Sequence, residues 1–398
     1  MWFDREISPL LARPTEHVQA VFGVRQSGKT SLLTRSAGPE RRFVTLDDAA
    51  ARDLANTDPR LFLSTFPPPL IIDECQLAPP LFPAIKVQVD QWRREGVPVG
   101  DARIWLTGTH QILVDRGIAE SLAGRVGYVT LHPLSMAEQC ASEGLPRRVD
   151  AASLLRGYFP RLCVPEAPPF VRWLDDYLRT VLERDVALLF GIKKTTAFLR
   201  AARLLAGHVG QLLNLSEIAR AVGVQVSTIS DWAGALTRMG VFHLVEPWST
   251  NTVSRLVKSP KVYACDPGVA ARLQGWSDAA PLAVSPAVGP LFENLVFLEI
   301  LKARDHHGRA WRVSTFRTRD GEEVDFIVED GAGSVVAVEA KMTRPSLAGL
   351  KRPRALDRSL PDATWAVVSG GDDPRLERDG AVLLGVAELG AFLRERLR

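Results

Sequence analysis

The stretch from Gly23 to Ser31 reads GVRQSGKTS and contains the pattern Gly-x-x-x-x-Gly-Lys-Thr. It follows a short apolar run, HVQAVF at 17–22, which predicts a buried strand. It leads into KTSLLTRS, which predicts a helix that begins at Lys29. A strand, a glycine-containing loop and a helix in this order are the context in which the pattern cradles phosphate groups. The sequence therefore predicts an α/β nucleotide-binding unit near the N-terminal end of the chain.

Each position of this phosphate loop has an expected role toward ATP and Mg²⁺. Gly23 and Gly28 let the backbone turn so that its N–H groups face phosphate oxygens. Lys29 is expected to reach the β- and γ-phosphates, and the Thr30 hydroxyl to ligate Mg²⁺. The N-terminus of the helix adds a favourable dipole. The other loop positions expected to contact the nucleotide are Gln26, Ser27 and Ser31.

Three more apolar runs predict strands of the same sheet: FVTLDD at 43–48, PLIIDE at 69–74 and RIWLTGT at 103–109. The second is continuously apolar, which is typical of a strand covered on both faces. It runs directly into Asp73 and Glu74. Asp73 is expected to hold Mg²⁺ through water, and Glu74 to polarise the water that attacks the γ-phosphate.

Two further features near this unit have both a functional and an ordinary interpretation. Thr107, Thr109 and His110 end the fourth strand, where they either report the presence of the γ-phosphate or simply form a strand-to-turn junction. Arg125 follows a glycine after a helical stretch. It is either a solvated arginine or a finger that reaches a neighbouring subunit's nucleotide, a role worth roughly 10³–10⁵ in rate in GTPases.

The motifs GVRQSGKTSLL, IIDECQ, LTGT and ESLAGRV, in this order and spacing, resemble those of a family of bacterial and archaeal AAA+ ATPases. In that family the ATPase module precedes a C-terminal region catalogued as a domain of unknown function. The resemblance continues through YLRTVLERDV at 177–186, VYACDPGVA at 262–270 and EEVDFIV at 322–328, so it covers nearly the whole chain. One departure is Thr-Gly-Thr-His, where the family often has Thr-Gly-Ser and a polar residue.

The resemblance implies roles for five residues. Lys29, Thr30, Asp73 and Glu74 become the ATPase residues, and Arg125 becomes the finger. Because the finger of such modules acts in trans, the resemblance also implies self-association as a ring, commonly a hexamer.

The middle of the chain is predicted to be helical. Residues 170–205 predict helices that form a lid, and residues 213–248 follow the pattern of a helix-turn-helix. In that pattern Gly223 occupies the turn between two short helices with apolar faces. The segments VFHLVEPW and KVYACD predict the strands of a wing. This part is therefore expected to be a winged helix.

A winged helix often contacts DNA, and its alternative use is as a spacer or a subunit contact. The outward residues of the second helix are polar but weakly basic; they are Gln225, Ser227, Thr228, Asp231 and Arg238. The wing carries Arg255, Lys258 and Lys261, which are expected to grip phosphates without reading sequence. Binding to DNA is therefore expected to be mainly sequence-independent.

The last segment carries a possible second metal site. The stretch AAPLAVSPAVGP at 279–290 predicts a linker. Beyond it, Asp325 and the pair Glu339 and Lys341 on adjacent predicted strands resemble the PD-(D/E)xK nuclease fold, in which two carboxylates hold Mg²⁺ and a lysine orients water. Glu293, on a preceding helix, often completes such a site. The alternatives are an inactive DNA-binding or assembly module, or carboxylates that pair with nearby arginines.

Composition bounds the class of protein. Of 398 residues, 46% are hydrophobic and 24% are charged, which is ordinary for a soluble globular protein. No apolar run approaches the ~20 residues that span a bilayer, and the N-terminus lacks the layout of a secretion signal, so we expect a cytoplasmic protein with no membrane partner. The net charge of +3 does not by itself indicate nucleic acid. The scattered cysteines predict neither zinc nor disulfides; they are Cys75, Cys140, Cys163 and Cys265.

The sequence thus predicts an α/β protein in three parts. Residues 1–168 are expected to be a P-loop AAA+ domain, 169–278 the helical lid and winged helix, and 284–398 the nuclease-like domain. The leading hypothesis is an ATP-driven ring that moves on or remodels branched or forked DNA in repair. One alternative is an ATP-regulated, metal-dependent nuclease, and another is an NTP-dependent switch that binds a protein partner.

Overall fold

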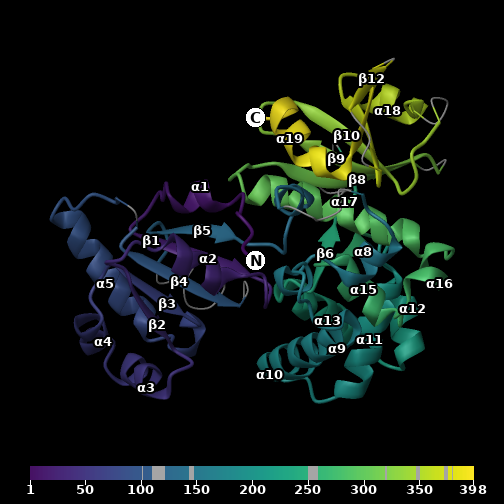
Figure 1. Ribbon diagram of the computed structural model, residues 1–398. Helices are drawn as coiled ribbons and strands as arrows, with labels where there is room; N and C mark the ends of the chain where they lie inside the picture. Colours follow the sequence, from purple (N-terminus) through teal and green to yellow (C-terminus); the bar gives the residue numbers. More distant parts are fainter. Residues whose placement is uncertain are drawn as a thin grey trace.

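The computed structural model of the chain describes residues 1–100, 102–109, 122–142, 148–249, 259–318, 321–346, 350–371, 375–378 and 380–398. Its helices and strands form three neighbouring groups: an N-terminal sheet with its helices, a helical group beside it, and a C-terminal sheet (Figure 1). The mixed α/β class predicted from the sequence is confirmed.

The N-terminal sheet has five parallel strands in the order β2-β3-β4-β1-β5. Their bounds are β1 (Val18–Gly23), β2 (Arg42–Thr45), β3 (Leu70–Asp73), β4 (Ile104–Thr109) and β5 (Val126–Thr130). Every residue of β1 and β3 is buried, as a strand covered on both faces requires. Because the strands are parallel, their carboxyl ends meet at one edge, and the phosphate loop and Asp73 lie there.

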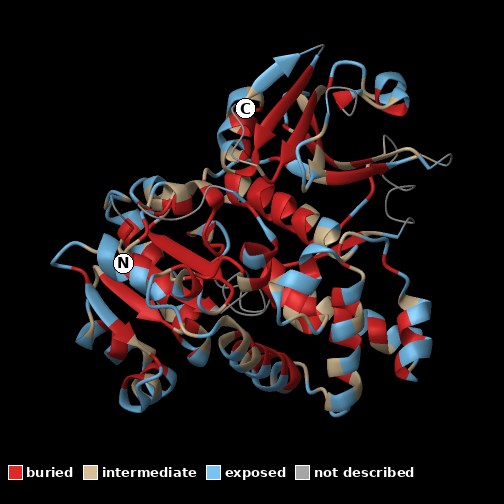
Figure 2. Ribbon diagram, turned by 45° about the vertical axis from the view of Figure 1, so that its right-hand side comes forward, coloured by how far each residue is buried: buried red, intermediate tan, exposed pale blue. Residues whose placement is uncertain are grey.

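Helices cover both faces of this sheet. One face packs against α3 (Ala49–Thr57), α4 (Pro59–Thr65) and α5 (Leu81–Arg94). The other packs against α1 (Ser8–Leu11) and α2 (Lys29–Ser36), and α2 begins at Lys29 as predicted. The short turn η1 (Cys75–Leu77) follows β3. Figure 2 shows the buried central strands between these helices, whereas the edge strands β2 and β5 have exposed residues.

The helical group begins after β5. Its elements are α7 (Met136–Cys140), α8 (Ala151–Arg156), η3 (Pro160–Leu162), α9 (Phe170–Leu178), the π-helix η4 (Arg179–Val186), α10 (Ala187–Leu189), α11 (Thr195–Gly207), α12 (Leu215–Val222), α13 (Val226–Arg238), β6 (Phe242–Val245), β7 (Lys261–Ala264) and α15 (Pro267–Leu273). The predicted turn between α12 and α13 lies at Gly223, whose φ of 81° favours glycine. Strands β6 and β7 pair antiparallel.

The C-terminal group is a six-stranded mixed sheet in the order β12-β13-β11-β10-β9-β8. Its elements are α17 (Val288–Asp305), β8 (Arg312–Arg317), β9 (Glu323–Glu329), β10 (Val335–Lys341), α18 (Arg354–Ser359), β11 (Thr364–Ser369), β12 (Leu376–Arg378), β13 (Ala381–Gly385) and α19 (Val386–Arg396). Strands β8, β9 and β10 form an antiparallel meander, and β11 lies parallel to β10. Helices α17 and α19 pack on one face, and α18 packs on the other.

The segment at 279–290, predicted as a linker, is largely helical instead of an irregular loop. Residues Ala279–Ala283 form α16, and α17 begins at Val288. The Asp278 carboxylate accepts a hydrogen bond from the backbone N–H of Ala280 and caps α16, while Leu282 is fully buried. The cap and the burial outweigh the loop-forming composition.

Helix α17 belongs to both the helical group and the C-terminal group. Its apolar side chains share one continuous core cluster with α8, α11, α13 and α15 on one side and with the C-terminal strands on the other. Among the described helices, none combines the length and apolar character needed to cross a bilayer.

Candidate functional site

A cavity of about 740 Å³ lies beside the phosphate loop. Its walls come from the loop, from the N-terminal residues 1–5 and from the segment 160–166. Sites for small molecules and cofactors commonly measure about 300–1,000 Å³, so a nucleotide fits this space. The residues predicted from the sequence that line it are Gln26, Gly28, Lys29, Thr30, Ser31 and Glu74.

Two glycines of the loop are required by its geometry. Gly28 has a φ of 94°, which side-chain-bearing residues rarely adopt. A Cβ on Gly23 would lie 2.1 Å from the carbonyl oxygen of Leu131, so the backbones of the loop and of the segment after β5 approach too closely for any side chain. The pattern of glycines thus reflects one turn and one close backbone contact.

The Lys29 ammonium is buried at the floor of the site. It donates to the carbonyl oxygens of Gly23 at 2.9 Å and Val24 at 3.0 Å. Burial lowers the pKa of Lys29 from 10.5 to about 8, although the carboxylates of Glu74 and Asp73 act in the opposite direction. The ammonium therefore titrates near pH 8 and lines the cavity beside the loop.

The acidic pair after β3 meets the phosphate loop, as the sequence predicts. The Thr30 hydroxyl donates to Asp73 Oδ1 at 3.1 Å, across 43 residues of sequence. Burial, together with the neighbouring Glu74, raises the pKa of Asp73. Glu74 has the left-handed φ of 53°, which is unusual for a non-glycine residue and frequent at functional sites. Its carboxylate accepts a hydrogen bond from Gln76 and lines the cavity.

The remaining predicted positions differ in exposure. Ser27 is completely buried, and its hydroxyl has no hydrogen-bond partner among the described residues, while Gln26 has a φ of 65°. Thr107 is buried in β4, and within the same described ranges its hydroxyl also lacks a partner. The Thr109 side chain and His110 lie outside the described residues.

Arg125 lies at the opposite edge of the sheet from the phosphate loop. The strand pairing places its neighbour Val126 opposite Val18, at the start of β1, whereas the loop follows the end of β1. About 16 Å of strand separates the two edges. The guanidinium pairs with Asp90 of α5, with Nε 2.5 Å from Oδ1 and Nη2 3.1 Å from Oδ2. Arg125 therefore does not reach the nucleotide cavity of its own chain.

Several residues of the site have no signal in the sequence. The N-terminal side chains of Trp2, Phe3 and Arg5 line the cavity. Arg25 of the phosphate loop forms a two-bond ion pair with Asp185 of η4, 160 residues away. In the sequence, these contacts are represented only by an apolar N-terminus and by single charged residues. Such features are too common to predict which residues pair.

A second group of charged residues, which we call the acidic cluster, comprises Glu293, Glu323, Asp325 and Glu339. Asp325 is half-buried in β9 and accepts a hydrogen bond from the backbone N–H of Ala340 at 2.8 Å. Burial, followed by the charges of Glu293 and Glu339, raises the pKa of Asp325 well above its usual value. Lys341 pairs with Glu339 at 2.6 Å. The structure thus brings together the C-terminal residues that the sequence grouped.

Lys261 is not a phosphate-gripping wing residue, so that prediction is wrong. Its side chain is buried, with its ammonium 3.0 Å from Glu293 and 2.5 Å from Glu323. Tyr263 donates a hydrogen bond of 2.6 Å to the same Glu293. The cause is the pairing of β7 with β6, which turns Lys261 inward toward α17 and β9. Arg255 and Lys258, by contrast, lie outside the described residues.

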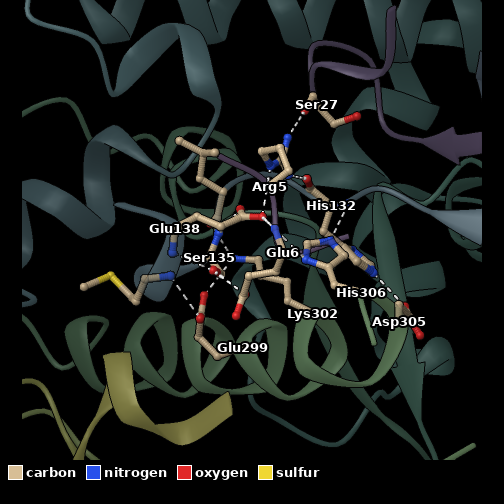
Figure 3. A network of polar contacts seen from close by, with 12 residues as sticks. Arg5, Glu6, Ser27, His132, Ser135, Glu138, Glu299, Lys302, Asp305 and His306 are labelled. Carbon is tan, nitrogen blue, oxygen red and sulfur yellow. Dashed lines mark hydrogen bonds and ion pairs between the residues drawn. The ribbon is translucent and has the colours of Figure 1, made fainter. Parts of the chain in front are cut away.

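Among the described residues, no three carboxylates of the acidic cluster lie within 4.8 Å of one another. Within the described ranges, the one group of three potential ligand side chains whose atoms lie within 4.8 Å of one another is Glu6, Glu138 and His306. Those residues belong to a buried polar network between the N-terminal segment and α17 (Figure 3).

Comparison with known families divides the chain into three matches. A model described as an AAA domain matches residues 15–140. Two models described as domains of unknown function, DUF8612 and DUF4143, match residues 151–280 and 288–389.

Curated relatives match most of the chain. Uncharacterized proteins of Mycobacterium bovis and Mycobacterium tuberculosis are each 34% identical over 374 residues, which cover 92% of this chain and 80% of the relative. Among solved structures, a Walker-type ATPase of Pyrococcus abyssi shares 18% identity over 69% of this chain and 96% of its own, with a TM-score of 0.43.

Proposed function

This chain belongs to the same family as the two mycobacterial relatives and carries an AAA domain at residues 15–140, and from that premise we propose that it binds ATP with Mg²⁺ beside the phosphate loop and hydrolyses it. The observation that carries the proposal is the contact between Thr30 and Asp73, beside a cavity that Thr30, Lys29 and Glu74 line. A hydroxyl and a carboxylate held together at this edge suit a divalent ion. The family and the residues of the site therefore both support Mg²⁺-dependent hydrolysis of ATP.

Each residue has a separate task in this reaction. Lys29 places a positive charge on the terminal phosphates, and the backbone N–H groups of the loop surround them. Thr30 and Asp73 would hold Mg²⁺, which neutralises charge on the phosphate oxygens when bound. Glu74 orients and polarises the attacking water. Arg25, held by Asp185, ties the loop to the helical group, which suits a lid.

The proposal is tested by replacing Lys29 with alanine. We expect ATP binding to weaken and hydrolysis to fall to background, because the main point charge on the phosphates is removed. The measurements are phosphate release and the dissociation constant of a fluorescent ATP analogue, with Mg²⁺ present. Arg13→Met, at an exposed position, is the control. Normal hydrolysis by Lys29→Ala would contradict the proposed site.

We expect the affinity for ATP to fall as the pH rises above about 8. Phosphates favour the protonated ammonium, so binding at higher pH must take up a proton on Lys29, whose pKa in the free protein is about 8. The dissociation constant should rise by up to about tenfold per pH unit there. Lys29→Arg, which stays charged, should remove the dependence. A wild-type dissociation constant that is flat across pH 8 would contradict this.

The same shift affects folding with a definite sign. The folded-state pKa of Lys29 lies below the unfolded value of 10.5, so the unfolded chain binds more protons between about 8 and 10.5. The contribution of Lys29 to the free energy of unfolding therefore rises with pH through this window.

We also propose that the protein acts on DNA in a sequence-independent way as an oligomeric ring. Support comes from α12 and α13, which are joined by the tight turn at Gly223, and from the β6–β7 hairpin that follows them, an arrangement typical of winged helices. The exposed face of α13 is polar and carries Asp231, which does not favour reading of bases. Movement on branched or forked DNA in repair is the activity that this combination of parts suits best.

The DNA proposal is tested by the ATPase rate with single-stranded, duplex and forked DNA. We expect stimulation by DNA of any sequence and a binding constant that falls steeply with salt. Absence of both binding and stimulation would favour the other candidate, a nucleotide-dependent switch that binds a protein partner.

A second candidate function is metal-dependent cleavage of DNA. It is favoured by the proximity of Asp325, Glu339 and Lys341 on β9 and β10. The buried Lys261 argues against it, because its ammonium already pairs with Glu293 and Glu323 and offsets part of their negative charge. We propose that this region holds DNA or supports assembly rather than cutting.

We therefore expect forked and duplex DNA to remain intact during incubation with the protein and Mg²⁺ or Mn²⁺. The measurement is product length on a denaturing gel. Cleavage by the wild type that disappears in both Asp325→Ala and Glu339→Ala would overturn this expectation and establish the nuclease.

A further inference from the structure

Arg5 is buried against the phosphate loop, and each of its three guanidinium nitrogens donates a hydrogen bond. Its side chain is 4% exposed. Nη1 donates to the carbonyl oxygen of Ser27 at 2.9 Å, Nη2 donates to that of His132 at 2.7 Å, and Nε donates to Glu138 Oε1 at 3.0 Å (Figure 3). Hydrogen bonds from a charged donor are stronger than neutral ones. Arg5 thus links the loop to the segment that follows β5.

The contact with Ser27 bears directly on the nucleotide site. The Ser27 carbonyl belongs to the peptide group that joins Ser27 to Gly28, so fixing its oxygen fixes the direction of the Gly28 N–H. In the proposed site, that N–H is one of the loop donors expected to face phosphate oxygens. Arg5 also lines the cavity. It can therefore orient the loop backbone without itself being one of the groups that donate hydrogen bonds to phosphate.

Glu138 holds Arg5 from the side away from the cavity. Its Oε1 also accepts from the backbone N–H of Glu6 at 2.8 Å, and its Oε2 accepts from the N–H of Ser135 at 2.9 Å. Both oxygens are therefore occupied by the protein's own donors, so the group formed with His306 does not need a metal ion. The Ser135 hydroxyl completes a capping box that begins α7.

Helix α17 fixes the same segment from below in Figure 3. Lys302 donates to the carbonyl oxygen of Leu134 at 2.8 Å, and Glu299 accepts from the N–H of Met136 at 3.0 Å. Lys302 and Glu299 pair with each other at 2.8 Å, both buried. At the end of the helix, Asp305 contacts the His132 ring at 2.7 Å. Residues 132–138 therefore lie between Arg5 and α17, with polar contacts to both.

We propose that Arg5 is a positioning residue for the phosphate loop, and that α17 sets the place of Arg5 through residues 132–138. This inference rests on the proposed ATP site. The first helix of the C-terminal group thereby supports the nucleotide site of the N-terminal group. The orientation of the Ser27–Gly28 peptide depends on contacts that extend from Ser27 through Arg5 and Glu138 to Lys302.

The first test compares Arg5→Met, Arg5→Lys and the exposed control Arg13→Met in the full chain. Arg5→Met removes the donors and should raise the dissociation constant of a fluorescent ATP analogue, and lower kcat, by about tenfold or more. Arg5→Lys keeps the charge and part of the donor set, so it should recover part of the loss. Circular dichroism and thermal unfolding confirm that each variant is folded at the assay temperature. Unchanged nucleotide affinity in a folded Arg5→Met protein overturns the proposal.

The second test changes residues of α17 and measures the effect on nucleotide binding at the phosphate loop. The double variant Glu299→Gln with Lys302→Met removes a buried ion pair without leaving one charge unpaired. We expect the dissociation constant for the nucleotide to rise by about threefold or more, since the residues changed lie outside the cavity wall. Arg312→Met with Glu329→Gln, which removes a more exposed ion pair between β8 and β9, is the control.

The outcomes separate this inference from the proposed function. Hydrolysis absent from wild type refutes the ATPase, while nucleotide affinity still decides the role of Arg5. The contribution of α17 is refuted if Arg5→Met raises the dissociation constant for the nucleotide while the folded double variant, Glu299→Gln with Lys302→Met, leaves it unchanged. A loss in the control pair equal to that of the double variant also refutes it, because the effect would then reflect general destabilisation.

Discussion

Replacing Glu74 with glutamine should stop ATP turnover while ATP still binds. Glutamine has the same shape, so it can occupy the left-handed position after β3 and still receive a hydrogen bond from Gln76. It loses the charge that polarises the attacking water, and the loss of a general base lowers kcat by about 10²–10⁴. Asp73 and Thr30, which would hold Mg²⁺, are unchanged, so the dissociation constant for ATP should be close to that of wild type.

The measurement is steady-state phosphate release beside equilibrium binding of ATP. Glu40→Gln, at an exposed position on the same domain, is the matched control and should behave as wild type. A Glu74→Gln protein that hydrolyses ATP at the normal rate means that another group activates the water.

Replacing Arg125 with alanine should lower hydrolysis by a factor on the order of 10³ without loss of ATP binding. Arg125 lies at the edge of the sheet opposite its own phosphate loop, paired with Asp90. From that edge its guanidinium can meet a nucleotide only in a second subunit. In an assembled ring it would leave Asp90 and contact the neighbour's phosphates.

A mixing experiment tests the requirement for a second subunit. Arg125→Ala supplies an intact loop, and Lys29→Ala supplies an intact finger, so mixing the two inactive proteins should restore part of the activity. Arg94→Ala, an exposed arginine near the end of α5, is the control. A wild-type protein that is strictly monomeric and fully active at high dilution would exclude a finger acting in trans.

The local parts of the fold and of the site could be predicted from the sequence. The phosphate loop needs a glycine at Gly28 for its φ and a strand and helix on either side, and all of these are visible within a few residues. The run into Asp73 is apolar because β3 is buried on both faces. Such features depend on neighbours in sequence, so a pattern is enough to predict them.

The parts that were missed depend on contacts between distant segments. Strand β5 was not predicted, because its alternation of exposed and buried residues is that of a sheet edge with little apolar continuity. Lys261 resembled a surface cation until β7 turned it toward Glu293. Arg5 meets Glu138 across 133 residues, and a single arginine near a terminus carries no sign of that partner.

The position of α17 has a consequence for how this protein can evolve. This helix shares one hydrophobic core with the middle helices and the C-terminal strands. Exchanging the C-terminal region for an unrelated one would therefore expose apolar side chains of the middle helices to water. Recombination between genes would therefore rarely succeed at this boundary. The three regions should be inherited as a single unit, and the mycobacterial relatives do align across 92% of the chain.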